Sequence, residues 1–391
     1  MNKIRYFDHA ATTAVKGEVL KEMLPYFNLE FGNPSSIYSL GRKAKRAIEE
    51  ARDKVANAIN ANSKEIYFTG CGSEGDNIVI KGIVYALKEK GNHIITSKIE
   101  HPAVLNTCKT LEKEGFDVTY LNVDKDGLIN LEELERSITQ KTILVSIMFA
   151  NNEIGTIQPI EGIGNIAKKH NIIFHTDAVQ ATGNVRIDVK QMNIDALTIS
   201  AHKFYGPKGV GAVYVKTGIK FNKLQDGGHQ ERDKRAGTEN VPGIVGLGKA
   251  IEIAYQNFDE YNEKLQKLRD YYISEIEKRI SYVKLNGHRT KRLPGNANIS
   301  FEFIDGESLL PNLDMKGICA SSGSACTSGS LNPSHVLLAI GLPQKIAQGS
   351  LRVTFGEENT KEDVDFLIES LVEIIGKLRN MSQEYREMMK K

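Results

Sequence analysis

The sequence has 391 residues, with 51 Lys and Arg against 49 Asp and Glu, and 40% of its residues are hydrophobic. This composition is typical of a globular protein of about two or three domains, and it excludes a disordered or fibrous chain. The formal net charge is only +2 and the basic residues are dispersed among acidic ones, which excludes a strongly basic surface for nucleic acid or membranes. We therefore expect a small substrate, with no direct nucleic-acid partner and no membrane partner.

The four cysteines are spaced too widely for a disulfide-rich secreted domain, and no pair forms a C-x-x-C motif. No apolar run follows the basic residues near the N-terminus, and no stretch of about 18 uncharged apolar residues occurs. We expect a cytoplasmic protein with reduced cysteines. Cys71, Cys108 and Cys319 are each predicted to be buried in a structural role.

Short β-branched runs alternate with helical stretches from Glu65 to Val215. This alternation predicts an α/β fold in which helices cover a mostly parallel seven-stranded sheet. The expected strands are EIYFTG, HIITS, DVTYL, TILVSIMFA, IIFHTDAV, ALTIS and GVGAVYVK. One apolar face at helical spacing predicts a helix from Ser35 to Ile59 that packs on this sheet.

The pattern changes after a glycine-rich stretch, where apolar residues at i, i+3 and i+4 predict a long helical run from about Gly243 to Ile280. A strand, a helix, a Ser/Gly/Cys loop and a second strand follow. Thr360 and Asp363 can open the last helix with a capping box. The expected division is a large domain at 16–243 and a smaller C-terminal α/β domain at 244–391, joined by 1–15 and carrying the loop at about 319–333.

A carboxylate and a lysine follow neighbouring predicted strands. Asp177 ends the strand IIFHTDAV, and Lys203 comes directly after ALTIS. The carboxyl ends of strands line the ligand crevice of an open α/β sheet, so the two side chains should meet there. A desolvated lysine can form a Schiff base with pyridoxal phosphate (PLP), whose ring nitrogen an acid keeps protonated. The alternative is a surface lysine in a Gly-Pro turn.

The segment FTGCGSEGDN joins a strand to a helix that is expected to start near Glu74. The amides of Gly72 and Ser73 and the Ser73 hydroxyl can meet a phosphate at this helix N-terminus. Ser200 and His202 flank the lysine and can donate to the same dianion. The alternative is a glycine-rich turn that holds no ligand.

Two further residues are candidates for catalysis. His101 begins a helix after HIITS, where an imidazole can stack on a cofactor ring and carry a proton, although a helix cap is the more ordinary role. Cys326 lies in a loop of small residues and can act as a nucleophile. A zinc site of Cys319, Cys326 and His335 is the rival interpretation, but the gaps match no usual ligand spacing.

Asn152 follows the strand TILVSIMFA, and Arg352 lies in the predicted strand SLRVTF. A guanidinium binds a carboxylate through two parallel hydrogen bonds, so Arg352 is a candidate anchor for an amino-acid substrate. The alternative is an arginine on an edge strand that faces water.

Together these residues resemble the cysteine desulfurases of the NifS/IscS type, which belong to the class V aminotransferase family of fold-type I PLP enzymes. The resemblance extends almost from end to end, through motifs in the family's order. They are YFDHAATT, FGNPSS, EHPAVLNTCK, ILVSIMFANNEIGTIQPI, HTDAVQATG, SAHKFYGPKGVGAVYV, QERDKRAGTENV and SSGSACTSGS. FTGCGSEGDN departs from the more usual SGATESDN, and its serine keeps the hydroxyl.

The resemblance implies that Lys203 carries PLP, Asp177 pairs with the ring nitrogen, His101 stacks on the ring and Gln180 meets the ring hydroxyl. Cys326 corresponds to the nucleophile. The implied contacts to the phosphate come from Gly72, Ser73, Ser200, His202 and, from a neighbouring subunit, Thr238. The implied contacts to the substrate carboxylate come from Asn152, which also touches the cofactor, and from Arg352.

The resemblance also implies the reaction: L-cysteine becomes L-alanine, and its sulfur becomes a persulfide on Cys326. It implies a homodimer with composite sites and a protein sulfur acceptor, either an iron–sulfur scaffold or a tRNA-thiolating enzyme. No stable metal site is expected, although Cys326 could briefly contact a nascent cluster. The competing hypotheses are a lyase or aminotransferase on the same fold and a PLP-binding module without catalysis.

Overall fold

The computed structural model describes residues 3–322 and 333–390, and its centre is a seven-stranded sheet. Six strands share one direction and only β8 runs antiparallel to its neighbours β2 and β7. All seven strands expected from the sequence are confirmed. In sheet order they are β2 (Ile66–Thr69), β8 (Gly211–Val215), β7 (Ala196–Ser200), β6 (Ile173–Asp177), β5 (Thr142–Ser146), β3 (His93–Ser97) and β4 (Asp117–Leu121).

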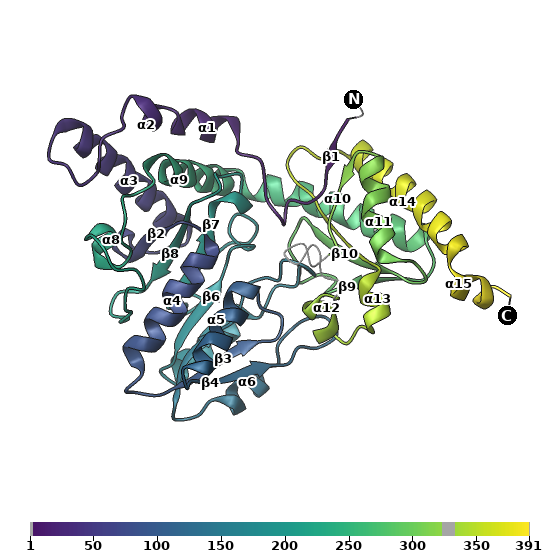
Figure 1. Ribbon diagram of the computed structural model, residues 1–391, viewed down its shortest axis with the longest axis horizontal. Coiled ribbons are helices and arrows are strands. Elements are labelled where there is room, and N and C mark those ends of the chain that lie inside the picture. Colours follow the sequence, from purple (N-terminus) through teal and green to yellow (C-terminus); the bar gives the residue numbers. More distant parts are fainter. Residues whose placement is uncertain (1–2, 323–332, 391) are drawn as a thin grey trace.

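Helices cover both faces of this sheet (Figure 1). The central strands are buried along their whole length, as expected for strands covered on both faces. Ile94 packs in the cluster that contains α4 and α5, while the next residue, Ile95, packs on the opposite face with α3 and α9. The helices and short 3₁₀ turns of this part are α1 (Gly17–Met23), α2 (Pro25–Asn28), α3 (Ser39–Ala58), η1 (Ser63–Glu65), α4 (Gly72–Leu87), α5 (Pro102–Lys113), α6 (Leu131–Ser137), α7 (Ile160–Lys169), η2 (Ala201–Lys203), α8 (Gln230–Asp233) and α9 (Val241–Gln256).

A second, smaller core follows in the chain. Its three-stranded antiparallel sheet, in the order β12-β10-β9, packs against long helices, and the N-terminal strand β1 pairs with β11 beside it (Figure 1). The elements of this part are β1 (Arg5–Tyr6), α10 (Phe258–Arg279), β9 (Val283–Asn286), β10 (Asn296–Phe301), α11 (Gly306–Met315), β11 (Ile318–Cys319), α12 (His335–Ala339), α13 (Gln344–Gln348), β12 (Ser350–Thr354), α14 (Lys361–Met381) and α15 (Gln383–Met388).

Several expectations need correction. The helical run predicted from about Gly243 to Ile280 is helical but consists of two helices, because α9 ends at Gln256 and α10 starts at Phe258, with the non-helical Asn257 between them. The helix predicted from Ser35 begins only at Ser39, because an extended residue precedes it. The capping box of Thr360 and Asp363 is confirmed. In residues 3–322 and 333–390 no helix has the length and apolar character needed to span a bilayer.

The cysteines differ from one another in exposure. Cys108 is buried as predicted, among apolar side chains of α5. Cys71 is exposed, which contradicts the prediction, because it stands at the open N-terminal end of α4. Cys319 is only partly buried, because it ends the two-residue strand β11.

Candidate active site

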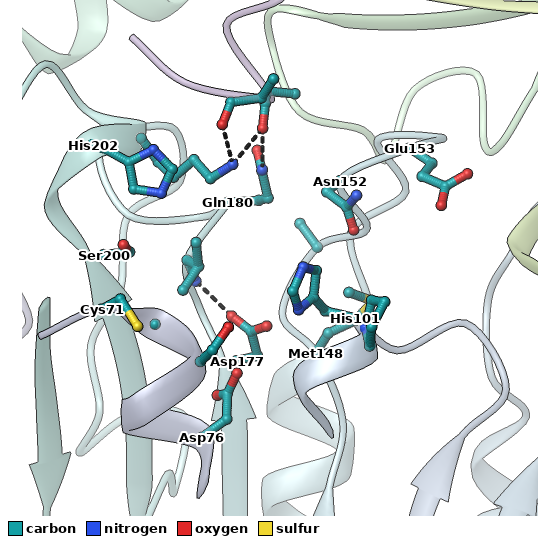
Figure 2. A pocket seen from close by; sticks show the side chains of 18 of the residues that line it. Cys71, Asp76, His101, Met148, Asn152, Glu153, Asp177, Gln180, Ser200 and His202 are labelled. Atoms are coloured by element: carbon teal, nitrogen blue, oxygen red, sulfur yellow. Dashed lines mark hydrogen bonds between the residues drawn. The ribbon is translucent and has the colours of Figure 1, made fainter. Parts of the chain in front are cut away.

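A cavity of about 580 Å³ opens at the carboxyl ends of the parallel strands, where the sequence places the candidate residues. The N-termini of α4 and α5 and the N-terminal segment of the chain also border it. The candidates that line it are Gly72, Ser73, His101, Asn152, Asp177, Gln180, Ser200, His202, Lys203 and Arg352. Figure 2 labels His101, Asn152, Asp177, Gln180, Ser200 and His202 among them. The structure therefore brings together every candidate of the cofactor and substrate sites except Cys326 and Thr238.

Asp177 lies at the floor of the cavity, at the end of β6. One oxygen, Oδ1, accepts a hydrogen bond from the backbone N–H of Val179 at 2.9 Å. Burial raises the pKa of Asp177, while His101 and Lys203 oppose that rise. A buried carboxylate of this kind is stabilised by a cation in the cavity, which is what a protonated ring nitrogen would supply.

Lys203 ends the 3₁₀ turn η2, directly after β7. It is half-buried and lines the cavity instead of projecting into solvent. Its Nζ donates hydrogen bonds to the carbonyl oxygens of Ala10 at 2.5 Å and Ala11 at 2.8 Å. Gln180 donates to the same Ala10 oxygen at 2.9 Å, so the N-terminal segment forms one wall of the site (Figure 2).

The N-terminus of α4 forms a small cradle. The helix begins at Gly72, two residues before the start expected from the sequence, and Cys71 caps it by accepting the Glu74 N–H at 3.4 Å. A Cβ added to Gly72 would lie 2.8 Å from Val179 and 3.4 Å from Ser200. Only glycine therefore fits here without displacing the wall of the cavity.

Unpaired donors face this cradle. The first N–H groups of a helix have no partner within the helix. The Ser200 hydroxyl is buried and has no hydrogen-bond partner within the described part of the chain. Burial, followed by the neighbouring Lys203, lowers the pKa of His202 to about 4, so its ring is neutral at pH 7. A phosphate dianion would satisfy the hydroxyl and the helix amides together, and the donor set therefore fits PLP.

His101 both caps a helix and lines the cavity. Its Nδ1 accepts the backbone N–H of Ala103 at 3.1 Å, at the start of α5. Burial lowers the pKa of His101, which favours the neutral ring. With Nδ1 engaged as an acceptor, the ring proton is on Nε2, and Figure 2 shows the imidazole beside Asp177.

Arg352 is almost fully buried, with 2% of its surface exposed, so its side chain does not face water although β12 is an outer strand of its sheet. Its Nη2 donates to Oδ1 of Asp8 at 2.7 Å, and its Nη1 donates to the carbonyl oxygen of Asn152 at 3.1 Å. Arg352 and the backbone of Asn152 are thus in contact, and both residues line the cavity.

Two candidates are not placed in this cavity. Cys326 lies outside the described residues, and so does most of the loop expected at about 319–333. The first described residues beyond it, Pro333 to His335, line the cavity. Thr238 is exposed and is not part of the lining formed by the described chain.

Sequence reasoning missed three acids around the site, of which Asp76 and Glu100 are buried and Asp8 is partly buried. Asp76 lies beside Asp177 (Figure 2), and burial followed by the charge of Asp177 raises its pKa. Glu100 is also fully buried, next to His101. Asp8 holds Arg352. All three acids lie inside motifs described above: YFDHAATT, FTGCGSEGDN and EHPAVLNTCK. The sequence alone does not show which residues of a motif lie close to the cavity.

Comparison with known proteins shows the family of the chain. Residues 5–367 match the aminotransferase class-V family. The chain is 60% identical to a protein named cysteine desulfurase IscS from Clostridium botulinum, over 100% of this chain and 99% of that protein. It is 58% identical to a protein of the same name from Methanosarcina thermophila, over 99% of this chain and 96% of that protein.

Solved structures agree as well. A NifS-like protein superimposes with a TM-score of 0.91 and 39% identity, covering 96% of this chain and all of that one. The structure described as SspA in complex with cysteine gives a TM-score of 0.81 and 40% identity, over 91% of this chain and all of that one. The chain therefore belongs to the cysteine desulfurases of the NifS/IscS type, which are PLP-dependent enzymes of the aminotransferase class-V family.

Proposed function

We propose that this chain binds PLP, takes L-cysteine as its substrate and transfers the substrate's sulfur to its own Cys326, leaving L-alanine. The observation that carries the proposal is the convergence of Lys203, Asp177, His101 and Arg352 on one cavity. A lysine, a buried acid and an arginine for a carboxylate are the groups that amino-acid chemistry with PLP requires.

The resemblance to the family and the lining of the cavity together support an assignment of the residues that would hold PLP. Asp177 would meet the ring nitrogen, Gln180 the ring hydroxyl and Lys203 the aldehyde carbon. The phosphate would take the cradle at Gly72 and the Ser200 hydroxyl, where a Cβ does not fit and a buried donor has no described partner. When bound, PLP supplies an electron sink for the negative charge left on the substrate α-carbon.

The chain's own side chains would then bind the substrate, transfer protons and attack its sulfur. Arg352 and Asn152 bind the substrate carboxylate and orient the amino acid. Lys203, once its amine is free, removes the α-proton and later returns a proton to the product. The Cys326 thiolate attacks the substrate sulfur, so that an S–S bond forms and the C–S bond breaks. His101, with a proton on Nε2, is placed to hold or supply a proton at this step.

The assembly is part of the same proposal. Exposed apolar side chains follow one another along α1, α2 and the segment before α3, which suits a surface that a second copy covers. Thr238, exposed in one chain, would then complete the phosphate contacts of its neighbour. The persulfide would be passed on to an iron–sulfur scaffold or to a tRNA-thiolating enzyme.

The test is to measure L-alanine and sulfide released from L-cysteine in the presence of a thiol reductant. We expect release from the wild type, and loss of at least about 100-fold in Cys326→Ala and in Lys203→Ala, since each removes a covalent participant. Cys108→Ala is the matched control, because it removes a thiol buried away from the cavity. Unchanged release from Cys326→Ala would favour a lyase, and bound PLP without any turnover would favour a non-catalytic module.

A further inference from the structure

We propose that Asp8 is a positioning residue: it holds the Arg352 guanidinium in place for the substrate carboxylate and thereby sets the affinity for the amino acid. This inference rests on the proposed function, since it assumes that Arg352 binds a substrate. It adds a role for an acid that is far from Arg352 in sequence and has no direct part in the chemistry.

The backbone of Asp8 is fixed alongside the strand that carries Arg352. Asp8 forms a parallel bridge with Thr354 of β12, and the Thr354 N–H donates to the carbonyl oxygen of Phe7 at 2.8 Å. The Tyr6 hydroxyl donates to the Asp8 carbonyl oxygen at 3.0 Å. The carboxylate of Asp8 is thus presented to Arg352 from a tethered segment.

The backbone of Arg352 is equally constrained. It pairs with Asn298 of β10 on one side and forms a bridge with Ser321 on the other. The side chain remains long and flexible, with a large rotamer entropy to lose when it is ordered. Within the described residues, two contacts orient its guanidinium: the ion pair with Asp8 and the hydrogen bond to the Asn152 carbonyl oxygen.

One nitrogen of this guanidinium makes no hydrogen bond within the described residues. The Nε of Arg352 is buried and has no hydrogen-bond partner in the described part of the chain. Arg352 lines the cavity, so an incoming carboxylate can accept from the guanidinium while Asp8 keeps Nη2. A buried donor without a partner is uncommon in a folded protein, and a ligand that satisfies it gains the full hydrogen bond.

Asp8 has two opposing electrostatic effects on a substrate carboxylate. Its charge repels the carboxylate, and its ion pair holds the guanidinium where the carboxylate needs it. We infer that the second effect is larger, because an Arg352 side chain without this partner must be ordered anew by each substrate molecule. The same contact exists before and during the reaction, so its loss should raise KM and leave kcat nearly unchanged.

The experiment uses the PLP-loaded wild type, Asp8→Ala, Asp8→Asn and the control Asp259→Ala, which removes an exposed aspartate paired with Arg186. Dissociation constants for L-alanine and for ethylamine, which lacks the carboxylate, are read from the visible absorption of the bound cofactor. Steady-state KM and kcat are measured with L-cysteine. Circular dichroism and cofactor content show that each variant is folded and loaded.

For Asp8→Ala we expect L-alanine binding and the KM for L-cysteine to weaken by about tenfold or more, the scale of one charge-assisted hydrogen bond. Ethylamine binding and kcat should change by less than about threefold. Asp8→Asn keeps an acceptor oxygen and should restore most of the affinity. Asp259→Ala should behave as the wild type.

Two results would overturn the proposal: equal weakening of L-alanine and ethylamine, which indicates a general distortion, or tighter L-alanine binding in Asp8→Ala, which indicates that repulsion dominates. The failure of the proposed function has a different signature. In that case the wild type produces no L-alanine from L-cysteine, whatever the amino-acid affinities of the variants.

Discussion

At the scale of single residues, several buried acids lie in or close to the active site. Glu100 is fully buried and accepts hydrogen bonds from the Ser97 hydroxyl at 2.6 Å and from the Met148 N–H at 2.9 Å. Burial raises the pKa of Glu100 to about 8, although these two hydrogen bonds favour the ionised form. At neutral pH the folded protein therefore keeps a proton that the unfolded chain, with an ordinary glutamate pKa of about 4.3, releases.

This proton predicts how stability depends on pH. Between about pH 4.3 and pH 8 the folded state binds more protons than the unfolded state, so Glu100 lowers the free energy of unfolding as pH rises, by at most about 1.4 kcal/mol per pH unit. Glu100→Gln stays neutral and lacks this slope. We expect its stability relative to wild type to improve steadily from pH 5.5 to pH 7.5, measured by urea unfolding. Parallel pH profiles of the two proteins would contradict the prediction, since the other acids are common to both.

How much of the site could be predicted depends on the neighbourhood of each residue in sequence. Asp177 and Lys203 could be found because each follows a recognisable strand, and strand ends converge in a mostly parallel sheet. The pairing of Asp8 with Arg352 could not be predicted, because the two residues are 344 positions apart and meet through the bridge between Asp8 and Thr354 of β12, outside the central sheet. The exposure of Cys71 could not be predicted either, because it depends on the open N-terminal end of α4.

At the scale of elements, periodicity identified the strands well but did not show where one helix gives way to another. The apolar spacing continues from α9 into α10, yet α9 packs with α3 on the central sheet while α10 contributes to the second core. One straight helix could not pack into both cores, and the helix is interrupted at Asn257. The break is a tertiary effect that local sequence does not encode.

The packing of α4 on the sheet gives a prediction about stability. A Cβ on Gly75 would lie 2.8 Å from Thr198 of β7 and 2.9 Å from Val213 of β8, both of which are buried. Gly75→Ala should therefore destabilise the protein by about 1–3 kcal/mol through overpacking, measured as a lower midpoint of urea unfolding. Because α4 also carries the phosphate cradle, PLP affinity should fall as well.

A matched substitution separates packing from helix propensity. Gly376 lies inside α14, where a Cβ would meet no atom within 4 Å. Gly376→Ala should stabilise the protein by about 0.5–1 kcal/mol, the intrinsic advantage of alanine over glycine in a helix. A gain of stability in both variants would show that α4 can move away from the sheet at little cost.

At the scale of the whole molecule, one surface is too apolar to suit a chain that works alone. The segment from α1 to the start of α3 lies at one end of the molecule, away from the second core (Figure 1). Seven large apolar side chains there are between 48% and 90% exposed: Leu20, Leu24, Phe27, Leu29, Phe31, Ile37 and Tyr38. Such a cluster marks an interface, and a second copy of the chain is the partner that the proposed composite site requires.

Introducing charges on this surface should therefore both dissociate the two copies and weaken the binding of PLP. We expect the double variant Leu29→Glu, Phe31→Glu to sediment as a single chain where the wild type sediments as two, because burying two carboxylates in an apolar interface is strongly unfavourable. PLP affinity should fall by about tenfold or more, since Thr238 of the neighbouring copy no longer reaches the phosphate. Met315→Glu, which places a charge on an exposed methionine of α11, is the control and should change neither property. A single-chain variant that keeps full PLP affinity would show that each chain completes its own phosphate site, and the assignment of Thr238 to its neighbour would then be wrong.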